Sequence, residues 1–168
     1  SHVVRLDSLA TDLNSVATTP AFSFIVPNLC NDGHDEPTCA DGKSAGGLPA
    51  VNRFLQAWVP QITNSPAFRK DGLLIITFDE AGTSDTTACC GEPSGPNTLL
   101  PGLTGPGGGR IGAVLLSPFI QPGTVSNTPY NHYGLLKSVE DVFSLSHLGY
   151  AGMSGLQGFG SDVYTAAH

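Results

Sequence analysis

Apolar residues recur at helical spacing in three parts of the chain. Leu6, Leu9 and Leu13 mark the first part, and Leu48, Val51 and Leu55 begin the second. This spacing places the apolar side chains on one face of an amphipathic helix. In the third part, Thr128 is suited to cap a helix and Pro129 to occupy its first turn. The pattern therefore predicts helices over residues 6–17, 48–62 and 128–145.

Three short apolar runs, rich in aromatic and β-branched residues, predict buried strands at 21–27, 73–78 and 111–119. Loops rich in glycine and polar residues separate the predicted elements, and a glycine-rich tail follows the last helix. Helices that alternate with continuously apolar strands are typical of an α/β fold, in which helices cover both faces of a mainly parallel sheet. We therefore expect an α/β/α sandwich, with ligands beyond the carboxyl ends of the strands.

Composition narrows the class of protein. The 168 residues fit one domain, and we find neither an internal repeat nor an interdomain linker. The formal net charge of −7, with only seven Lys and Arg residues, argues against a nucleic-acid-binding protein. No apolar run approaches the roughly 18 residues of a membrane-spanning helix. Charged residues make up only 12% of the sequence, and we associate such a composition with secreted proteins.

The four cysteines lie in or beside polar loops, at Cys30, Cys39, Cys89 and Cys90. Their spacing does not fit an ordinary zinc site, so disulfides in an oxidising compartment are the better interpretation. A bond between Cys30 and Cys39 would pin the loop between them, and a bond between Cys89 and Cys90 would be strained. Four cysteines allow three pairings, and the sequence leaves them open.

Two adjacent carboxylates end the second predicted strand, in the stretch GLLIITFDEAG. Asp79 and Glu80 need a partner for their charges, and oxygen ligands of this kind suit a hard divalent cation. Both side chains can reach one ion only if the strand ends and turns there, which Ala81 and Gly82 allow. The alternative is a helix cap or an ordinary loop contact.

Two further polar clusters follow predicted strands. Asp32, His34 and Asp35 lie in the stretch NDGHDE after the first strand, where the alternative is a solvated loop histidine. His132 begins the helix that follows the third strand, where a histidine is also a common cap. Arg110, after three glycines, could clamp an oxyanion or simply lead into the strand.

A serine hydrolase is a second hypothesis, because GKSAG at 42–46 matches G-x-S-x-G. Ser44, Asp79 and His132 follow the order of a serine, acid and histidine triad. However, the nucleophile of such enzymes sits directly after a strand, and no strand is predicted before Ser44. A third hypothesis is an inactive secreted binding module of the same fold.

Four stretches, in this order, resemble the bacterial phosphoesterase family that contains acid phosphatases and phosphatidylcholine-type phospholipases C. They are FIVPNLCNDGHD, SPAFRKDGLLIITFDEA, GGGRIGAVLLSPFIQPGTVS and YNHYGLLKSVEDVFSL. The resemblance implies an alkaline-phosphatase-like fold and metal-dependent hydrolysis of phosphate esters. It implies that Asp79 and Glu80 are ligands of a divalent metal. It places His34 and His132 in the phosphate pocket as ligands or proton donors, and it includes Asp32 and Asp35 in the same motif without fixing their roles.

The resemblance is to the carboxyl-terminal portion of such an enzyme. The family's E-N-x-x-F-D stretch and its Ser or Thr nucleophile have no counterpart in these residues. We therefore expect an N-terminal portion of the same protein as partner, an incomplete fold, and an isolated chain without activity. The substrate is expected to be a phosphate ester, a phospholipid being one option, and the location to be secreted, periplasmic or on the cell surface.

Overall fold

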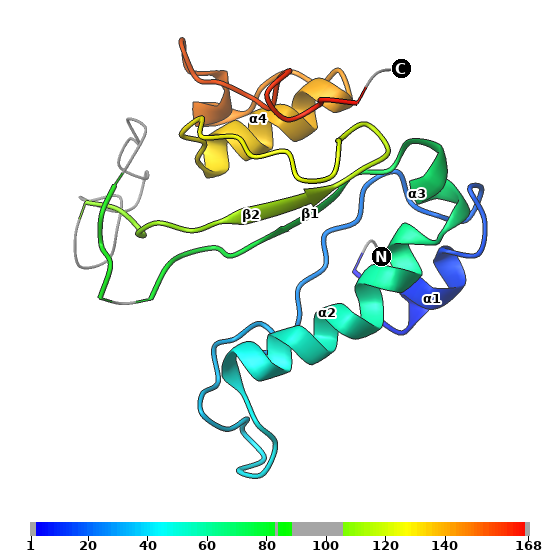
Figure 1. Cartoon of the computed structure of the whole chain (residues 1–168), viewed down its shortest axis with the longest axis vertical. Helices are drawn as coiled ribbons and strands as arrows, with labels where there is room; N and C mark the ends of the chain where they lie inside the picture. The colour runs from blue at the N-terminus through cyan, green and yellow to red at the C-terminus, as the bar shows by residue number, and fades with distance from the viewer. Residues whose placement is uncertain (1–2, 83, 89–105, 167–168) are drawn as a thin grey trace. The chain divides into compact units, whose positions relative to one another are not determined.

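The computed structural model describes residues 3–82, 84–88 and 106–166 (Figure 1). The chain divides into two compact units, Ser1–Leu74 and Ile75–His168, and each is described by itself.

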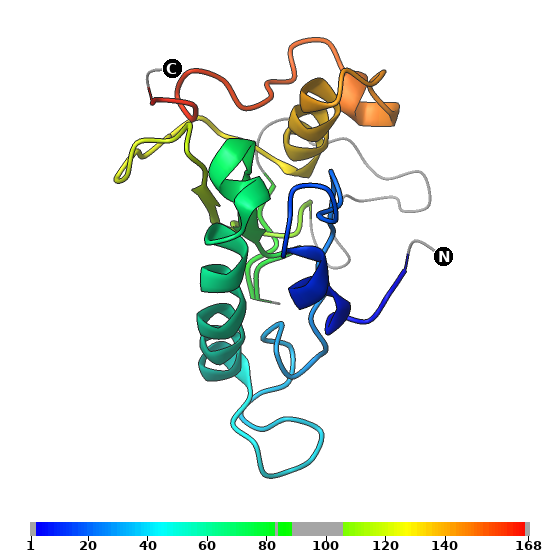
Figure 2. The same ribbon diagram turned by 90° about the vertical axis from the view of Figure 1, so that its right-hand side faces the viewer.

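The first unit contains three helices, α1 (Ser8–Asp12), α2 (Gly47–Thr63) and α3 (Pro66–Asp71). The predicted helix at 48–62 is confirmed as α2, the long helix that dominates this unit in Figure 2. The first predicted helix is shorter than expected, because the chain leaves it in turns after Leu13. None of the described helices combines the length and apolar character needed to cross a bilayer.

Helix α3 was not predicted, although its start has a clear local signal. The Ser65 side chain accepts a hydrogen bond from the Phe68 amide, and Pro66 occupies the first turn. This arrangement satisfies one of the free amides at the helix start, and proline fits there because its missing amide is not needed. The helix is only six residues long, too short for apolar periodicity to reveal it.

The strand predicted at 21–27 is not formed within the described part of the chain. The segment has no strand assignment, and Phe24 and Val26 are 83% and 70% exposed. Within the described part of the chain, residues 23–27 make no hydrogen bond. A strand needs a neighbouring strand for its backbone groups, so this apolar segment has the composition of a buried strand without the pairing that would form one.

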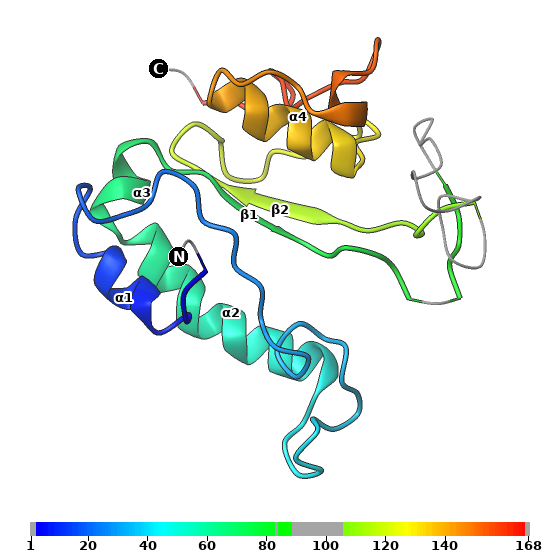
Figure 3. The same ribbon diagram turned by 180° about the vertical axis from the view of Figure 1, so that it is seen from behind.

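Strands β1 (Leu74–Thr77) and β2 (Ala113–Leu116) confirm the other two predicted strands and form a two-stranded sheet (Figure 3). The pair is antiparallel: the Ala81 amide bonds to the Gly108 carbonyl, and the Thr77 hydroxyl bonds to the Gly112 carbonyl. As the residue number rises from 77 to 81 on one segment, the number of its partner falls from 112 to 108, as it must in an antiparallel pair. The expected parallel direction is therefore not seen in this pair.

The pairing opens just beyond the sheet, where residues 78–80 lie opposite 109–112. No backbone hydrogen bond joins Asp79 or Glu80 to Gly109 or Arg110. The Arg110 amide instead donates to the Asp85 carboxylate, at 3.0 Å.

Asp85 accepts two further hydrogen bonds, from the Thr87 amide and hydroxyl. Together with the bond from the Arg110 amide, these donors hold the pKa of Asp85 below its usual range. The chain around Gly109 is packed so closely that an added Cβ would lie 2.4 Å from the Asp85 carbonyl and 2.6 Å from the Ala81 Cβ. Gly109 also has a φ of 78°, which favours glycine.

Helix α4 (His132–Val142) starts later than predicted, and Asn131 rather than Thr128 is its cap. The Asn131 side chain accepts a hydrogen bond from the Gly134 amide at 2.9 Å. Asparagine competes well for this position because its side chain reaches the free amides of the first turn. Pro129 therefore lies before the helix instead of in its first turn.

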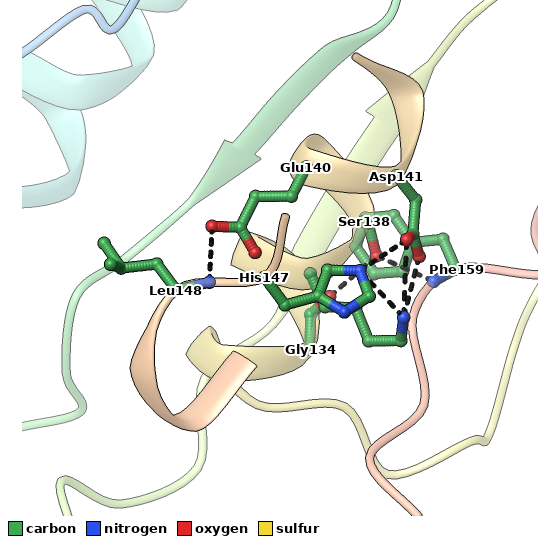
Figure 4. A network of polar contacts seen from close by, with 8 residues as sticks. Gly134, Ser138, Glu140, Asp141, His147, Leu148 and Phe159 are labelled. Atoms are coloured by element: carbon green, nitrogen blue, oxygen red, sulfur yellow. Dashed lines mark hydrogen bonds and ion pairs between the residues drawn. The ribbon is translucent and has the colours of Figure 1, made fainter. Parts of the chain in front are cut away.

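A polar network ties the carboxyl-terminal tail to α4 (Figure 4). The Ser138 hydroxyl donates to the Gly134 carbonyl and accepts from the Phe159 amide, both at 2.7 Å. Glu140 is 6% exposed and accepts from the Leu148 amide, just before the short 3-10 helix η1 (Gly149–Gly152).

The backbone of the carboxyl-terminal tail lies very close to the backbone of α4. An added Cβ at Gly134 would lie 2.7 Å from the Gln157 carbonyl oxygen, so the tail requires glycine there. His147 Nε2 lies 2.6 Å from the Asp141 carboxylate, which joins the segment after α4 back to the helix.

A second anchor of the tail is the Asp162 carboxylate. It accepts hydrogen bonds from the hydroxyls of Ser126 and Tyr130. These donors, Ser126 first, hold the pKa of Asp162 at about 2. Tyr130 also packs edge-on against Phe159, with ring centroids 5.0 Å apart.

The buried apolar core is small. Among the described residues no large side chain is fully buried, and on the sheet Val114 is 59% exposed. The apolar side chains that are buried come from both units: Leu9, Leu13, Cys39, Ala50, Ala151 and Val163.

We predict that Asp85→Ala releases the backbone next to the end of β1. The Arg110 amide loses its acceptor, so it should exchange its hydrogen several-fold faster, as measured by hydrogen–deuterium exchange. Asp71→Ala is the control, because Asp71 pairs with the neighbouring Lys70 and should leave the Arg110 amide unchanged. Equal exchange in Asp85→Ala and the unsubstituted chain would contradict the role given to Asp85.

We predict that Asp162 makes attachment of the tail sensitive to strong acid. A carboxyl whose pKa is lower in the folded than in the unfolded state stabilises the fold above its unfolded value of 3.8, and the effect is lost as pH falls towards about 2. Pepsin cleavage within residues 155–166 should therefore accelerate between pH 4 and pH 2.

In Asp162→Asn, cleavage should already be fast at pH 4 and should change little below it. Asp12→Asn, whose carboxylate accepts no hydrogen bond in the described part of the chain, should behave like the unsubstituted protein. A pH profile identical in Asp162→Asn and the unsubstituted chain would rule out this anchor.

Candidate functional site

Asp79 and Glu80 directly follow β1, where the strand pair opens. Both are exposed, and neither carboxylate makes a hydrogen bond or ion pair within the described part of the chain. The next residue, Ala81, is bonded through its amide to Gly108, so the chain is held on both sides of the two acids. The opened pair therefore presents two adjacent, unpartnered carboxylates on a fixed backbone.

His132 contacts the same point from the start of α4. Its Nε2 lies 2.7 Å from the Asp79 carbonyl oxygen. A carbonyl oxygen only accepts hydrogen bonds, so Nε2 donates and Nδ1 carries the lone pair of the neutral ring. His132 thus bonds the backbone of Asp79 while its second nitrogen remains available to accept a proton or a ligand.

The chemistry of Asp79 and Glu80 fits a hard divalent cation. Their four carboxylate oxygens are the ligand type that Mg²⁺ and Ca²⁺ prefer, and no protein donor uses them. Six or more ligands are usual for these ions. Among the described residues no group of three or more His, Cys, Asp or Glu converges on one point. The two acids would therefore form only part of a metal site.

The second cluster, Asp32, His34 and Asp35, belongs to the first unit. The Asp32 side chain accepts from the His34 amide at 2.9 Å, and His34 Nδ1 lies 3.2 Å from the Asp35 carboxylate. Since the carboxylate accepts, Nδ1 donates and Nε2 is left as the acceptor. The His34 side chain is 70% exposed, which suits contact with a ligand.

A disulfide and backbone contacts hold this loop in place. The bond between Cys30 and Cys39 confirms that the first two cysteines pair. The Asp35 amide donates to the Leu29 carbonyl, and the Gly47 amide at the start of α2 donates to the Asp35 carbonyl. Cys89 and Cys90 lie outside the described residues.

The structure thus brings the predicted site residues together as two sets. Asp79, Glu80 and His132 share the second unit, and Asp32, His34 and Asp35 share the first. Sequence reasoning did not identify Asp85, which fixes the backbone opposite the acids. The local signal for it was an aspartate two residues before Thr87, a spacing at which the side chain often accepts a hydrogen bond from the backbone of a turn.

Ser44 lacks the setting of a hydrolase nucleophile. Its hydroxyl donates to the Asp41 carboxylate at 2.6 Å, and its amide bonds to the same side chain. Turns and an isolated bridge at Thr38 precede it, not the strand that positions such a serine.

Residues 1–146 match the sequence profile of the Phosphoesterase family. The chain is 30% identical over 130 residues to an acid phosphatase of Aspergillus fumigatus. The aligned region covers 77% of this chain and 23% of that protein. The chain is 33% identical to a phosphate-repressible acid phosphatase of Penicillium chrysogenum, covering 77% of this chain and 25% of the relative.

A bacterial relative, a phosphatidylinositol-3-phosphatase of Mycobacterium tuberculosis, is 28% identical over 132 residues, covering 79% of this chain and 33% of the relative. The chain therefore spans about a quarter to a third of the length of these relatives. No solved structure matches it. Since the family profile extends over most of the sequence and includes both acidic clusters, the chain belongs to the Phosphoesterase family.

Proposed function

We propose that the protein containing this chain hydrolyses phosphate esters with the help of a divalent metal ion held at Asp79 and Glu80. The observation that carries this proposal is the pair of exposed carboxylates without a protein partner, in a chain of the Phosphoesterase family. Phosphoryl transfer needs positive charge beside the phosphoryl oxygens, and a metal ion bound there supplies it.

The two histidines are proposed to handle protons. His132 is held to Asp79 by Nε2, which leaves Nδ1 to accept or, in the imidazolium form, to donate a proton. His34 has the opposite arrangement, with Nδ1 held by Asp35 and Nε2 exposed. Asp32 acts on His34 only through the backbone, as a positioning residue. The hydroxyl nucleophile is proposed to come from outside these residues.

The missing parts of the site are proposed to come from an N-terminal portion of the same protein. The relatives are three to four times as long as the matched region, and the exposed apolar segment at 21–27 lacks a strand neighbour. Further strands beside this segment and the β1–β2 pair would complete the mainly parallel sheet of an alkaline-phosphatase-like α/β/α sandwich.

Two substrate classes follow from the names of the relatives. The fungal relative is named an acid phosphatase, and the mycobacterial relative is named for a phosphoinositide. We propose a phosphate ester as substrate and a location outside the cytoplasm, which the Cys30–Cys39 disulfide supports. Parallel assays with p-nitrophenyl phosphate and with phospholipid vesicles would separate a general phosphatase from a lipid-directed enzyme.

We predict that Asp79→Asn and Glu80→Gln each lower hydrolysis of p-nitrophenyl phosphate by the full-length protein at least about a hundredfold, because a metal ligand is lost. Chelation of the unsubstituted protein should have the same effect, and added Mg²⁺ or Ca²⁺ should reverse it. Ser44→Ala should retain full activity. Loss of activity in Ser44→Ala, with Glu80→Gln still active, would favour the serine hydrolase instead.

We predict that the isolated 168-residue chain is inactive and that the full-length protein is active, because the nucleophile lies elsewhere. The measurement is release of p-nitrophenol at equal molar concentration of the two proteins. Phosphatase activity from this chain alone would overturn the proposed division of the active site. An inactive full-length protein that binds no metal would favour the inactive binding module.

A further inference from the structure

Positive charge is scarce in the unit that contains Asp79 and Glu80. Residues 75–168 include two Lys or Arg residues, Arg110 and Lys137. Lys137 is already engaged, because its Nζ lies 3.0 Å from the Asp141 carboxylate and 3.2 Å from His147 Nε2. Arg110 is exposed, and its guanidinium makes no hydrogen bond or ion pair with any of the residues that the structure describes. The unit therefore has one basic side chain that is not in use.

The backbone of Arg110, in contrast, is fixed. Its amide donates to the Asp85 carboxylate, and the preceding amide of Gly109 donates to the Thr87 carbonyl at 3.0 Å. An added Cβ at Gly107 would lie 2.3 Å from that same Thr87 carbonyl, so the glycine segment is pressed against 85–88. Arg110 thus combines a held backbone with a free side chain.

This held backbone lies opposite the two acids. Residues 109–112 face 78–80 across the opened part of the strand pair, and the Ala81–Gly108 bond closes the opening on its far side. Side chains of residues that face each other across an antiparallel pair lie within reach when they are long. Even so, the guanidinium forms no ion pair with Asp79 or Glu80. The carboxylates and the guanidinium therefore remain separate groups, carried on backbone segments that face each other.

We propose that Arg110 binds the non-bridging oxygens of the substrate phosphoryl group, next to the metal-binding carboxylates. This inference rests on the proposed phosphoesterase function. A phosphate ester carries negative charge into a site that already holds two carboxylates, so a cation besides the metal would strengthen its binding. The planar guanidinium donates two parallel hydrogen bonds to phosphate oxygens, a geometry that lysine cannot reproduce.

The test is Arg110→Gln in the full-length protein, assayed with p-nitrophenyl phosphate and with inorganic phosphate as competitive inhibitor. We expect KM for the ester and the inhibition constant for phosphate both to rise about tenfold or more, since a charged hydrogen-bonding partner is lost. The Mg²⁺ or Ca²⁺ concentration for half-maximal activity should stay the same. Arg110→Lys should recover only part of the loss.

Lys137→Gln is the matched control, because it removes the other positive charge of the same unit and should leave both constants unchanged. Arg110→Gln is expected to fold, since the exposed guanidinium has no partner within the chain. Unchanged KM and inhibition constants in Arg110→Gln, while Asp79→Asn is inactive, would overturn the inference and leave the proposed function intact. Full activity in Asp79→Asn would overturn the proposed function and this inference with it.

Discussion

The pairing of β1 with β2 is the interaction on which the candidate site depends. Residues 79–80 and 109–110 are about 30 positions apart in the chain, and the antiparallel pair brings them face to face. The same pair then opens, and its backbone groups bond to side chains instead. The Asp79 carbonyl accepts from His132, and the Arg110 amide donates to Asp85. An interrupted sheet edge of this kind exposes charged side chains, while side-chain partners hold two of its backbone groups.

Periodicity in the sequence was sufficient to locate the elements whose apolar residues form one regular run. Helix α2 and strands β1 and β2 follow their apolar patterns within a few residues. The segment at 21–27 has an equally apolar pattern, but composition does not provide the neighbour that a strand requires. The direction of the strands could not be predicted either, because the same run of apolar residues fits a parallel and an antiparallel pair.

The site could be predicted as a set of residue types but not as a set of contacts. Adjacent acids after an apolar strand, and a histidine at a helix start, identified Asp79, Glu80 and His132. That His132 bonds a backbone carbonyl rather than a carboxylate depends on where α4 lies against the strand end. Asp85 shows the same limit, since three hydrogen bonds from residues 87 and 110 become visible only when the loop is folded.

The close contact between Gly134 and the tail joins a residue inside the family match to a segment beyond it. Gly134 lies inside the region that matches the family, whereas Gln157 lies beyond residue 146, where the match ends. A side chain at position 134 would therefore clash with a segment that lies beyond the family match. A relative with a differently routed tail would be free to carry alanine or serine there, so substitutions at this position should track the length and path of the carboxyl terminus across evolution.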